Sequence, residues 1–371
     1  MLQSLVTSMP LFVCGLLSLL LALNLGLRRF DTAQAWLLAW AVTATLLYGC
    51  HYVYFHHVPA LIPYTNTLYT LCNLLVYPLF LVYISELTER SPLSRRPWPL
   101  AAVFLPGLLL ASVVGCLYAL MTGDETAHFI DYYLYGNHLD TLSGTALCQG
   151  VAHQVCKVMF AVEVVIVMLL STRHIKRYNQ LVEQLYSDTE DKTLHMLSNL
   201  LWLVILCSLL SIAANAVGRN YFTHSLWLLS VPSVLFSLVL FSLGWVALNQ
   251  QFSIRDIAPE PAVAVESPAH DMLDDLHRRL LQLMEREKPF LQPDLKLDDL
   301  ALMLHTNRTY LLRVMRQKQQ MSFSEYINRR RIDYARRLMD EHPELSKHDV
   351  AARAGYSHPS SFYRNWKMYA C

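Results

Sequence analysis

"LKLDDLALMLHTNRTYLLRVMRQ", residues 295–317, decides the fold of the C-terminal third of this chain. Its first half has apolar residues at helical spacing and predicts a short buried helix over roughly 297–304. A turn is expected at residues 305–306, and Asn307 is a good N-cap for the helix that follows. Two short helices joined by a tight turn are typical of a helix-turn-helix unit.

The second helix of this unit has two different faces. Leu311, Val314 and Met315 are expected to face inward. The opposite face is polar and is predicted to be exposed; it consists of Arg308, Thr309, Leu312, Arg313 and Arg316. A helix that offers such a face can enter the major groove of DNA, where arginine binds guanine edges or phosphates.

A similar pattern recurs in "LSKHDVAARAGYSHPSSFYRNWKMY", residues 345–369. Gly355 supplies a turn where a positive φ is easy for glycine, and Pro359 falls in the first turn of the next helix. The side chains expected to point inward are Phe362, Trp366 and Tyr369. Those expected to point outward are Ser360, Ser361, Arg364 and Lys367. The sequence therefore predicts a second helix-turn-helix unit.

The segment "INRRRIDYARRL", residues 327–338, is predicted to be the helix that joins the two units. Its apolar residues can pack into both units and set the separation of the two exposed helices. Its arginines, expected on the exposed sides, are Arg329, Arg330, Arg331, Arg336 and Arg337. They either lie near phosphates or form a solvated face that keeps the domain soluble.

Charge supports the same interpretation weakly. Residues 288–371 hold 15 Lys and Arg against 9 Asp and Glu. A basic helical domain is typical of nucleic-acid binding, although a basic face near a membrane could equally bind anionic lipid.

These motifs, in this order, resemble the AraC-type DNA-binding domain of bacterial transcription regulators, over about residues 272–371. The whole chain resembles membrane-anchored regulators of that type, and "YSDTEDK" resembles their cytoplasmic loop. The resemblance implies double-stranded DNA as a partner and no cofactor or metal. The base contacts that it implies are Thr309, Leu312 and Arg313 in the first unit and Ser360, Tyr363 and Arg364 in the second.

The sequence departs from the family pattern at three places. His305 and Gln320 stand where the family usually has glycine, and histidine tolerates the left-handed region better than most residues. The family continues beyond the second unit with a Gly-x-Thr-Pro stretch and a short helix, whereas this sequence ends at Cys371. The expectation is a truncated domain with a loosened second unit.

The first 250 residues are predicted to be a seven-helix transmembrane bundle. Seven apolar runs are each long enough to cross a bilayer; they lie near residues 8–27, 35–55, 64–86, 99–121, 152–172, 194–217 and 225–248. Nine Lys and Arg follow the first, third and fifth runs. By the positive-inside rule the N-terminus is outside and the C-terminal domain is cytoplasmic. The expected location is the bacterial inner membrane.

The predicted fold class is therefore all-α. The expected domains are a transmembrane sensor or anchor over 1–250, a flexible linker over 251–271 and a DNA-binding domain over 272–371. The linker is rich in proline and lacks apolar periodicity.

Polar residues within the apolar runs suggest where a signal could act. Glu163 and His51 are candidates for an intramembrane signal site that binds an unknown small ligand, a proton or a membrane partner, or for interhelical hydrogen bonds. The external segment, about 122–151, is either a stimulus-binding region or a solvated loop. Cys148 and Cys156 flank its end and either pair or remain packing thiols.

An apolar stripe at heptad spacing spans residues 175–185. It predicts a helix that either pairs two chains as a homodimer or lies on its own bundle.

No phosphate loop, nucleophile elbow or zinc motif is present in the sequence, so an enzyme is not expected. The favoured hypothesis is a membrane-tethered one-component transcriptional regulator. The alternative is a small-molecule transporter or carrier with a regulatory DNA-binding tail, for which Glu163 is the only indication.

Overall fold

The structure is a computed structural model that describes residues 2–27, 31–217, 226–257 and 270–369. Within these ranges the chain is all-helical, as predicted, and contains no strand. It divides into two compact units. The first unit comprises Met1–Ile175 and His195–Ile254, and the second comprises Lys176–Leu194 and Arg255–Cys371.

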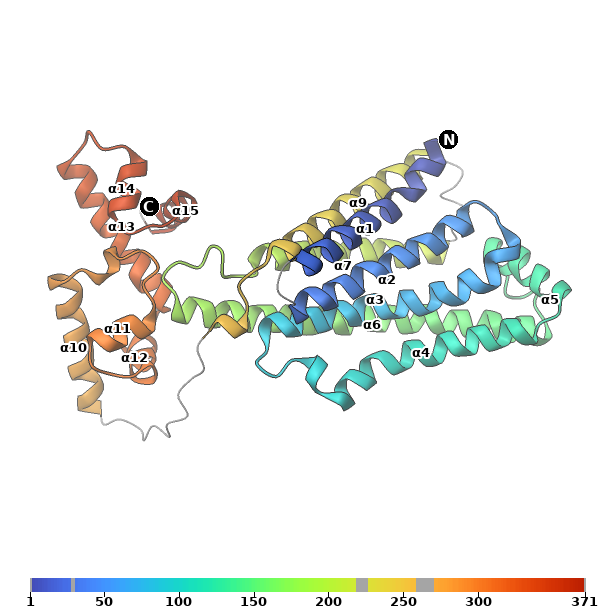
Figure 1. Cartoon of the computed structure of the whole chain (residues 1–371), viewed down its shortest axis with the longest axis horizontal. Coiled ribbons are helices and arrows are strands. Elements are labelled where there is room, and N and C mark those ends of the chain that lie inside the picture. The colour runs from blue at the N-terminus through green and yellow to red at the C-terminus, as the bar shows by residue number, and fades with distance from the viewer. Residues whose placement is uncertain (1, 28–30, 218–225, 258–269, 370–371) are drawn as a thin grey trace. The chain divides into compact units, whose positions relative to one another are not determined.

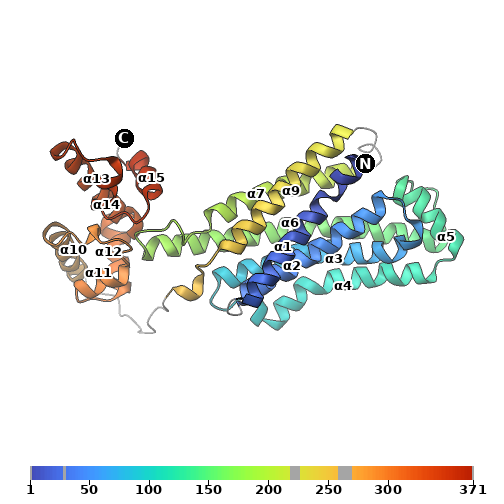
Figure 2. The same cartoon turned by 45° about the horizontal axis from the view of Figure 1, so that its top comes forward.

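Long apolar helices form the first unit and run alongside one another (Figures 1 and 2). They are α1 (Leu2–Leu27), α2 (Thr32–Phe55), α3 (Ile62–Thr88), α4 (Pro97–Leu120), α6 (Gly144–Leu185), α7 (His195–Val217) and α9 (Leu226–Asn249). Helix α1 packs against α2 and α9, and α3 packs against α2 and α4. Large apolar side chains such as Phe12, Leu109 and Val158 are exposed, which is typical of a surface that meets lipid.

The number of membrane crossings stays a prediction. Six segments of the described chain are long and apolar enough to span a bilayer. The predicted sixth run lies in helix α7. Its apolar part among the described residues, His195–Leu210, is shorter than those six segments. The fifth run, predicted at 152–172, belongs to the 42-residue helix α6, which continues through 175–185.

Residues 122–151 are partly packed and partly exposed: Asp124 and Asp140 are exposed, and the roles predicted for this segment stay open. Helix α5 (Gly123–His128) is followed by a π-helical segment, Phe129–Tyr135. Phe129, Ile130 and Tyr133 are buried in a core that includes residues of α3, α4 and α6. The thiols of Cys148 and Cys156 are both free.

Two polar groups in the bundle have contrasting surroundings. The Nδ2 of Asn66 lies 2.7 Å from the hydroxyl of Tyr118 and 2.7 Å from Nε2 of His153, in a buried network that the sequence pattern did not reveal. Glu163 Oε1 is buried and has no hydrogen-bond partner among the described residues. His51 stacks on Tyr69 at 5.0 Å between ring centroids.

The predicted pairing of two chains through residues 175–185 stays a prediction. Ile175, Tyr178, Val182 and Leu185 are all buried by the chain itself. The stripe is therefore covered within a single copy of the chain, which does not support a homodimer through it.

In the described residues, the second compact unit contains the end of α6 and a series of shorter helices. The shorter helices are α10 (His270–Arg286), α11 (Leu297–Met303), α12 (Arg308–Val314), α13 (Phe323–Glu341), α14 (Lys347–Arg353) and α15 (Pro359–Tyr369). Helix α13 packs against α14 and α15, and α12 packs against α10 and α11. Of the predicted linker, Ile254 and Ile257 are buried, and residues 258–269 lie outside the described chain.

Candidate nucleic-acid interface

The first helix-turn-helix unit, α11–turn–α12, forms as predicted. His305 takes the left-handed conformation (φ +49°) at the turn. The backbone N–H of Tyr310 donates to Asn307 Oδ1 at 2.9 Å, so Asn307 is the N-cap of α12. Leu311 and Val314 are fully buried. The segment after α12 ends at Gln320, which is also left-handed (φ +55°), where the family pattern has glycine.

Arg308 does not lie on the exposed face of α12, so that part of the prediction is wrong. Its side chain is 9% exposed and forms an ion pair with Asp298 of α11, with Nε 2.6 Å from Asp298 Oδ1. Two hydrogen bonds from one guanidinium to one carboxylate fix the geometry of both groups. Arg308 therefore fastens α12 to α11 in this structure.

The other residues expected on this face of α12 are accessible. Thr309, Leu312 and Arg313 are half-buried, and Arg316 is exposed. Neither Arg313 nor Arg316 forms an ion pair with another residue in the described ranges. The face therefore has two positive charges with no carboxylate beside them.

The second helix-turn-helix unit, α14–turn–α15, depends on Gly355. Its φ is +83°, and a Cβ there would lie 2.6 Å from the backbone oxygen of Leu291. Any other residue would be strained and would collide with the chain. Helix α15 then packs Phe362 against Tyr356, with ring centroids 5.4 Å apart.

The outward residues of α15 differ from the prediction at one position. Ser360, Tyr363, Arg364 and Lys367 are exposed, as expected for a face that could enter a groove. Ser361 was expected to point outward but is 3% exposed, so that expectation is wrong.

Helix α13 joins the two units, and its arginines do not all lie on its exposed side. Arg331, predicted to be exposed, is 1% exposed. Its Nε donates to the carbonyl of Phe290 and its Nη2 to the carbonyl of Gln292, both at 2.7 Å. Burial lowers the pKa of Arg331, because the desolvated guanidinium is less favourable there than in water. Arg331 thus ties α13 to the chain that precedes α11.

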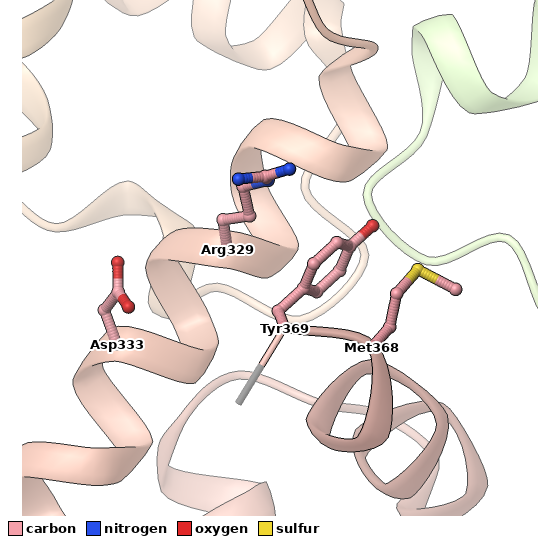
Figure 3. A pocket seen from close by; sticks show the side chains of 4 residues that line it. All are labelled: Arg329, Asp333, Met368 and Tyr369. Atoms are coloured by element: carbon pink, nitrogen blue, oxygen red, sulfur yellow. The ribbon is translucent and has the colours of Figure 1, made fainter. Parts of the chain in front are cut away.

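Other arginines of α13 hold the end of α15. Arg329 lies over the ring of Tyr369, 5.2 Å from its centroid, and pairs with Glu325 at 2.7 Å. Arg336 donates to the carbonyl of Tyr369 at 3.0 Å. Arg329 and Asp333 of α13 line a small pocket together with Met368 and Tyr369 of α15, and Figure 3 shows Arg329 pointing toward Tyr369. These contacts orient α15 on α13.

A segment far away in the sequence packs against α13 and against the chain before α11. Residues 186–187 lie between α6 and α7, yet the backbone N–H of Ser187 donates to the carbonyl of Leu295 at 3.1 Å. Asn328 of α13 donates to the carbonyl of Ser187 at 3.0 Å. No periodicity or charge pattern in the sequence pointed to this contact.

Residues 300–370 match the family model described as "Helix-turn-helix domain", of the AraC type. No curated protein and no solved structure gives a match to the chain. The match covers α12 to α15 and supports an AraC-type, DNA-binding regulator.

Proposed function

We propose that this chain is a membrane-tethered, one-component transcription regulator whose C-terminal domain binds promoter DNA. The observation that carries the proposal is the pair of helix-turn-helix units, which the matched residues 300–370 cover from the end of α11 onward. Each unit offers a second helix with accessible polar and basic side chains, which are half-buried on α12 and exposed on α15. Binding needs no catalytic group, only two faces that fit the major groove.

The proposed contacts divide into two kinds. Thr309, Leu312 and Arg313 of α12 and Ser360, Tyr363 and Arg364 of α15 are assigned to base edges, by resemblance to the family. Asn307, Arg316 and Lys367 are assigned to phosphates, where they fix register without specifying sequence. Ser361 belongs to the same helix turn as Ser360 but has to be uncovered before it can take part. Arg308 is assigned to fold stability.

The apolar helices of the first unit are proposed to cross the bacterial inner membrane. The Lys and Arg clusters of the loops support an N-terminus outside and a cytoplasmic C-terminal domain. Glu163 and His51 are the proposed intramembrane signal site. A buried carboxylate oxygen without a partner is costly in an apolar bundle, which supports a role beyond packing for Glu163.

The test is a selection on random duplex DNA with the full chain in lipid nanodiscs, at two salt concentrations. The expected result is a motif with two contact blocks about one helical turn (~10 base pairs) apart. Arg313→Ala and Arg364→Ala should each relax one block, at a cost of about 1–3 kcal/mol for the base lost. Arg337→Ala, an exposed change on α13, is the matched control. Recovery of no motif from the full chain would refute the proposed function.

A further inference from the structure

The loop between α6 and α7 is the least expected part of the second compact unit. We call residues 187–191 the acidic loop, because its sequence "SDTED" has three carboxylates. Both the loop and α15 belong to the second unit, so their contacts are internal to it.

One end of the acidic loop is anchored on α13. Ser187 is 1% exposed. Its carbonyl accepts hydrogen bonds from Asn328 Nδ2 at 3.0 Å and from Ser324 Oγ at 3.2 Å, and its hydroxyl lies 3.4 Å from Nη2 of Arg331. An irregular segment held by several hydrogen bonds from buried side chains has a defined position. The anchor therefore places the rest of the loop.

The other end of the acidic loop covers the start of α15. Ser360 Oγ donates to Glu190 Oε1 at 2.5 Å, and Ser361 donates to the other oxygen of the same carboxylate. Nη2 of Arg364 lies 4.0 Å from Glu190 Oε2, and Nε2 of His358 lies 3.2 Å from Asp191 Oδ2. One carboxylate thus contacts Ser360 and Arg364 of the face that is proposed to meet DNA, and the buried Ser361 beside it.

The charge of Glu190 is favoured at this position. Partial burial alone would raise its pKa, but the hydrogen bonds from Ser360 and Ser361 and the charge of Arg364 hold the pKa below its ordinary value. Glu190 is therefore ionised at neutral pH and presents to α15 the kind of charge that a phosphate would present.

We propose that the acidic loop is an intramolecular competitor of DNA: it occupies the reading face of α15 and must leave before that helix can enter the groove. This inference rests on the proposed function, whose DNA-binding face it regulates. Double-stranded DNA carries one negative charge per ~1.7 Å of its axis, so it would be repelled by three carboxylates at that face. Each serine hydroxyl also has a single hydrogen to donate, so it cannot donate to Glu190 and to a base or phosphate at once.

The position of the loop in the chain makes it a suitable point of control. Its two ends continue directly into α6 and α7, both of which are apolar helices with residues in the first unit. A change in the separation or rotation of these helices would therefore act on the loop through the chain itself. The signal needs only a few kcal/mol of difference between covered and uncovered α15.

The experiment removes the competing charges without removing the anchor. Glu190→Gln with Asp191→Asn is introduced into the full chain in nanodiscs, and binding to the duplex selected above is measured at one salt concentration. The matched control, Asp340→Asn with Glu341→Gln, removes the same charge from the exposed end of α13 in the same unit. We expect about tenfold tighter binding for the loop variant, because hydrogen bonds to a charged acceptor are the strong ones. The control should stay within about twofold.

A second measurement uses the unaltered chain. Hydrogen exchange of the loop peptide, residues 186–193, is compared with and without the selected duplex. Displacement of the loop predicts faster exchange there on DNA binding, while α12 becomes more protected.

The outcomes separate the two proposals. Equal affinities of the unaltered chain and the loop variant, together with loop exchange that DNA leaves unchanged, overturn the competitor and leave DNA binding standing. If neither chain selects or binds any duplex, the proposed function itself fails, and the competitor with it.

Discussion

Replacing the buried Arg331 by methionine tests how α13 is held against the chain that precedes α11. Methionine keeps most of the volume of the arginine stem but has no donor. The carbonyls of Phe290 and Gln292 would each lose a charged partner that now lies at 2.7 Å. Hydrogen bonds to charged groups contribute about 1.5–3 kcal/mol each, which gives a loss of about 3–6 kcal/mol.

Part of this loss is offset. A desolvated guanidinium is unfavourable unless it is paired, and within the described residues no carboxylate lies within ion-pair distance of Arg331. A further loss comes from the contact of the guanidinium with the ring of Tyr356, 5.3 Å from the ring centroid, which stabilises the folded unit by about 0.5–2 kcal/mol. Relief from burying an unpaired ion offsets several kcal/mol of these losses, so we expect a net destabilisation of about 2–3 kcal/mol for Arg331→Met. Arg331→Lys should cost at least as much, because it keeps a buried charge but lacks the planar fork that reaches both carbonyls.

Peptide-resolved hydrogen exchange on the full chain in nanodiscs measures this effect. Amides of α13 should exchange about 30- to 150-fold faster in Arg331→Met, since each 1.4 kcal/mol is a factor of ten. Arg337→Met, the same substitution at an exposed position of α13, should stay within about 0.5 kcal/mol of the unaltered chain. If the two variants behave alike, or if Arg331→Lys restores protection, the argument from the two carbonyls is wrong.

Other changes follow from the same structure. Gly355→Ala should destabilise the second helix-turn-helix unit by at least ~1–3 kcal/mol in the same exchange assay, because the φ of Gly355 is +83° and a Cβ would lie 2.6 Å from a backbone oxygen. Protection equal to that of the unaltered chain would contradict this. Asn307→Ala should cost about 1 kcal/mol through loss of the N-cap, and Asn307→Ser should restore most of it. Arg316→Gln should lower the slope of log K against log salt by ~0.9 on the selected duplex, whereas Arg308→Gln should leave the slope unchanged and lower stability instead. Glu163→Leu should raise the thermal midpoint of the apolar bundle, because it removes a buried oxygen that has no partner; a fall would mean that Glu163 is satisfied in the bilayer.

Apolar periodicity and an N-cap residue were sufficient to predict the two helices of the first helix-turn-helix unit. The apolar spacing of residues 297–304 and the N-cap at Asn307 depend only on neighbours along the chain, and both were confirmed. The left-handed turn at His305 was also foreseeable, since the family pattern has glycine there. Local chemistry of this kind can be read from a single sequence.

Side chains whose partners lie far along the chain could not be placed in this way. Arg331 and Arg329 are two positions apart on one helix and look alike in the sequence. One is buried against carbonyls of residues 290 and 292, and the other is exposed beside Glu325. Likewise Ser360 and Ser361 are adjacent and both donate to Glu190, some 170 positions earlier in the chain, yet Ser360 is exposed and Ser361 is buried. Tertiary contacts set these differences, and helical periodicity does not contain them.

The arginines of residues 327–338 therefore serve different purposes, and this bears on how DNA binding is controlled. Arg331 holds both the chain before α11 and Ser187 of the acidic loop, while Arg329 and Arg336 hold the end of α15. Helix α13 thus positions both α15, the proposed DNA-reading helix, and the acidic loop. If the Glu190 end of the loop moves while Ser187 stays anchored on α13, uncovering α15 needs no rearrangement of the two helix-turn-helix units. Only the few polar contacts of Glu190 and Asp191 have to break, and a signal of modest energy is enough for that.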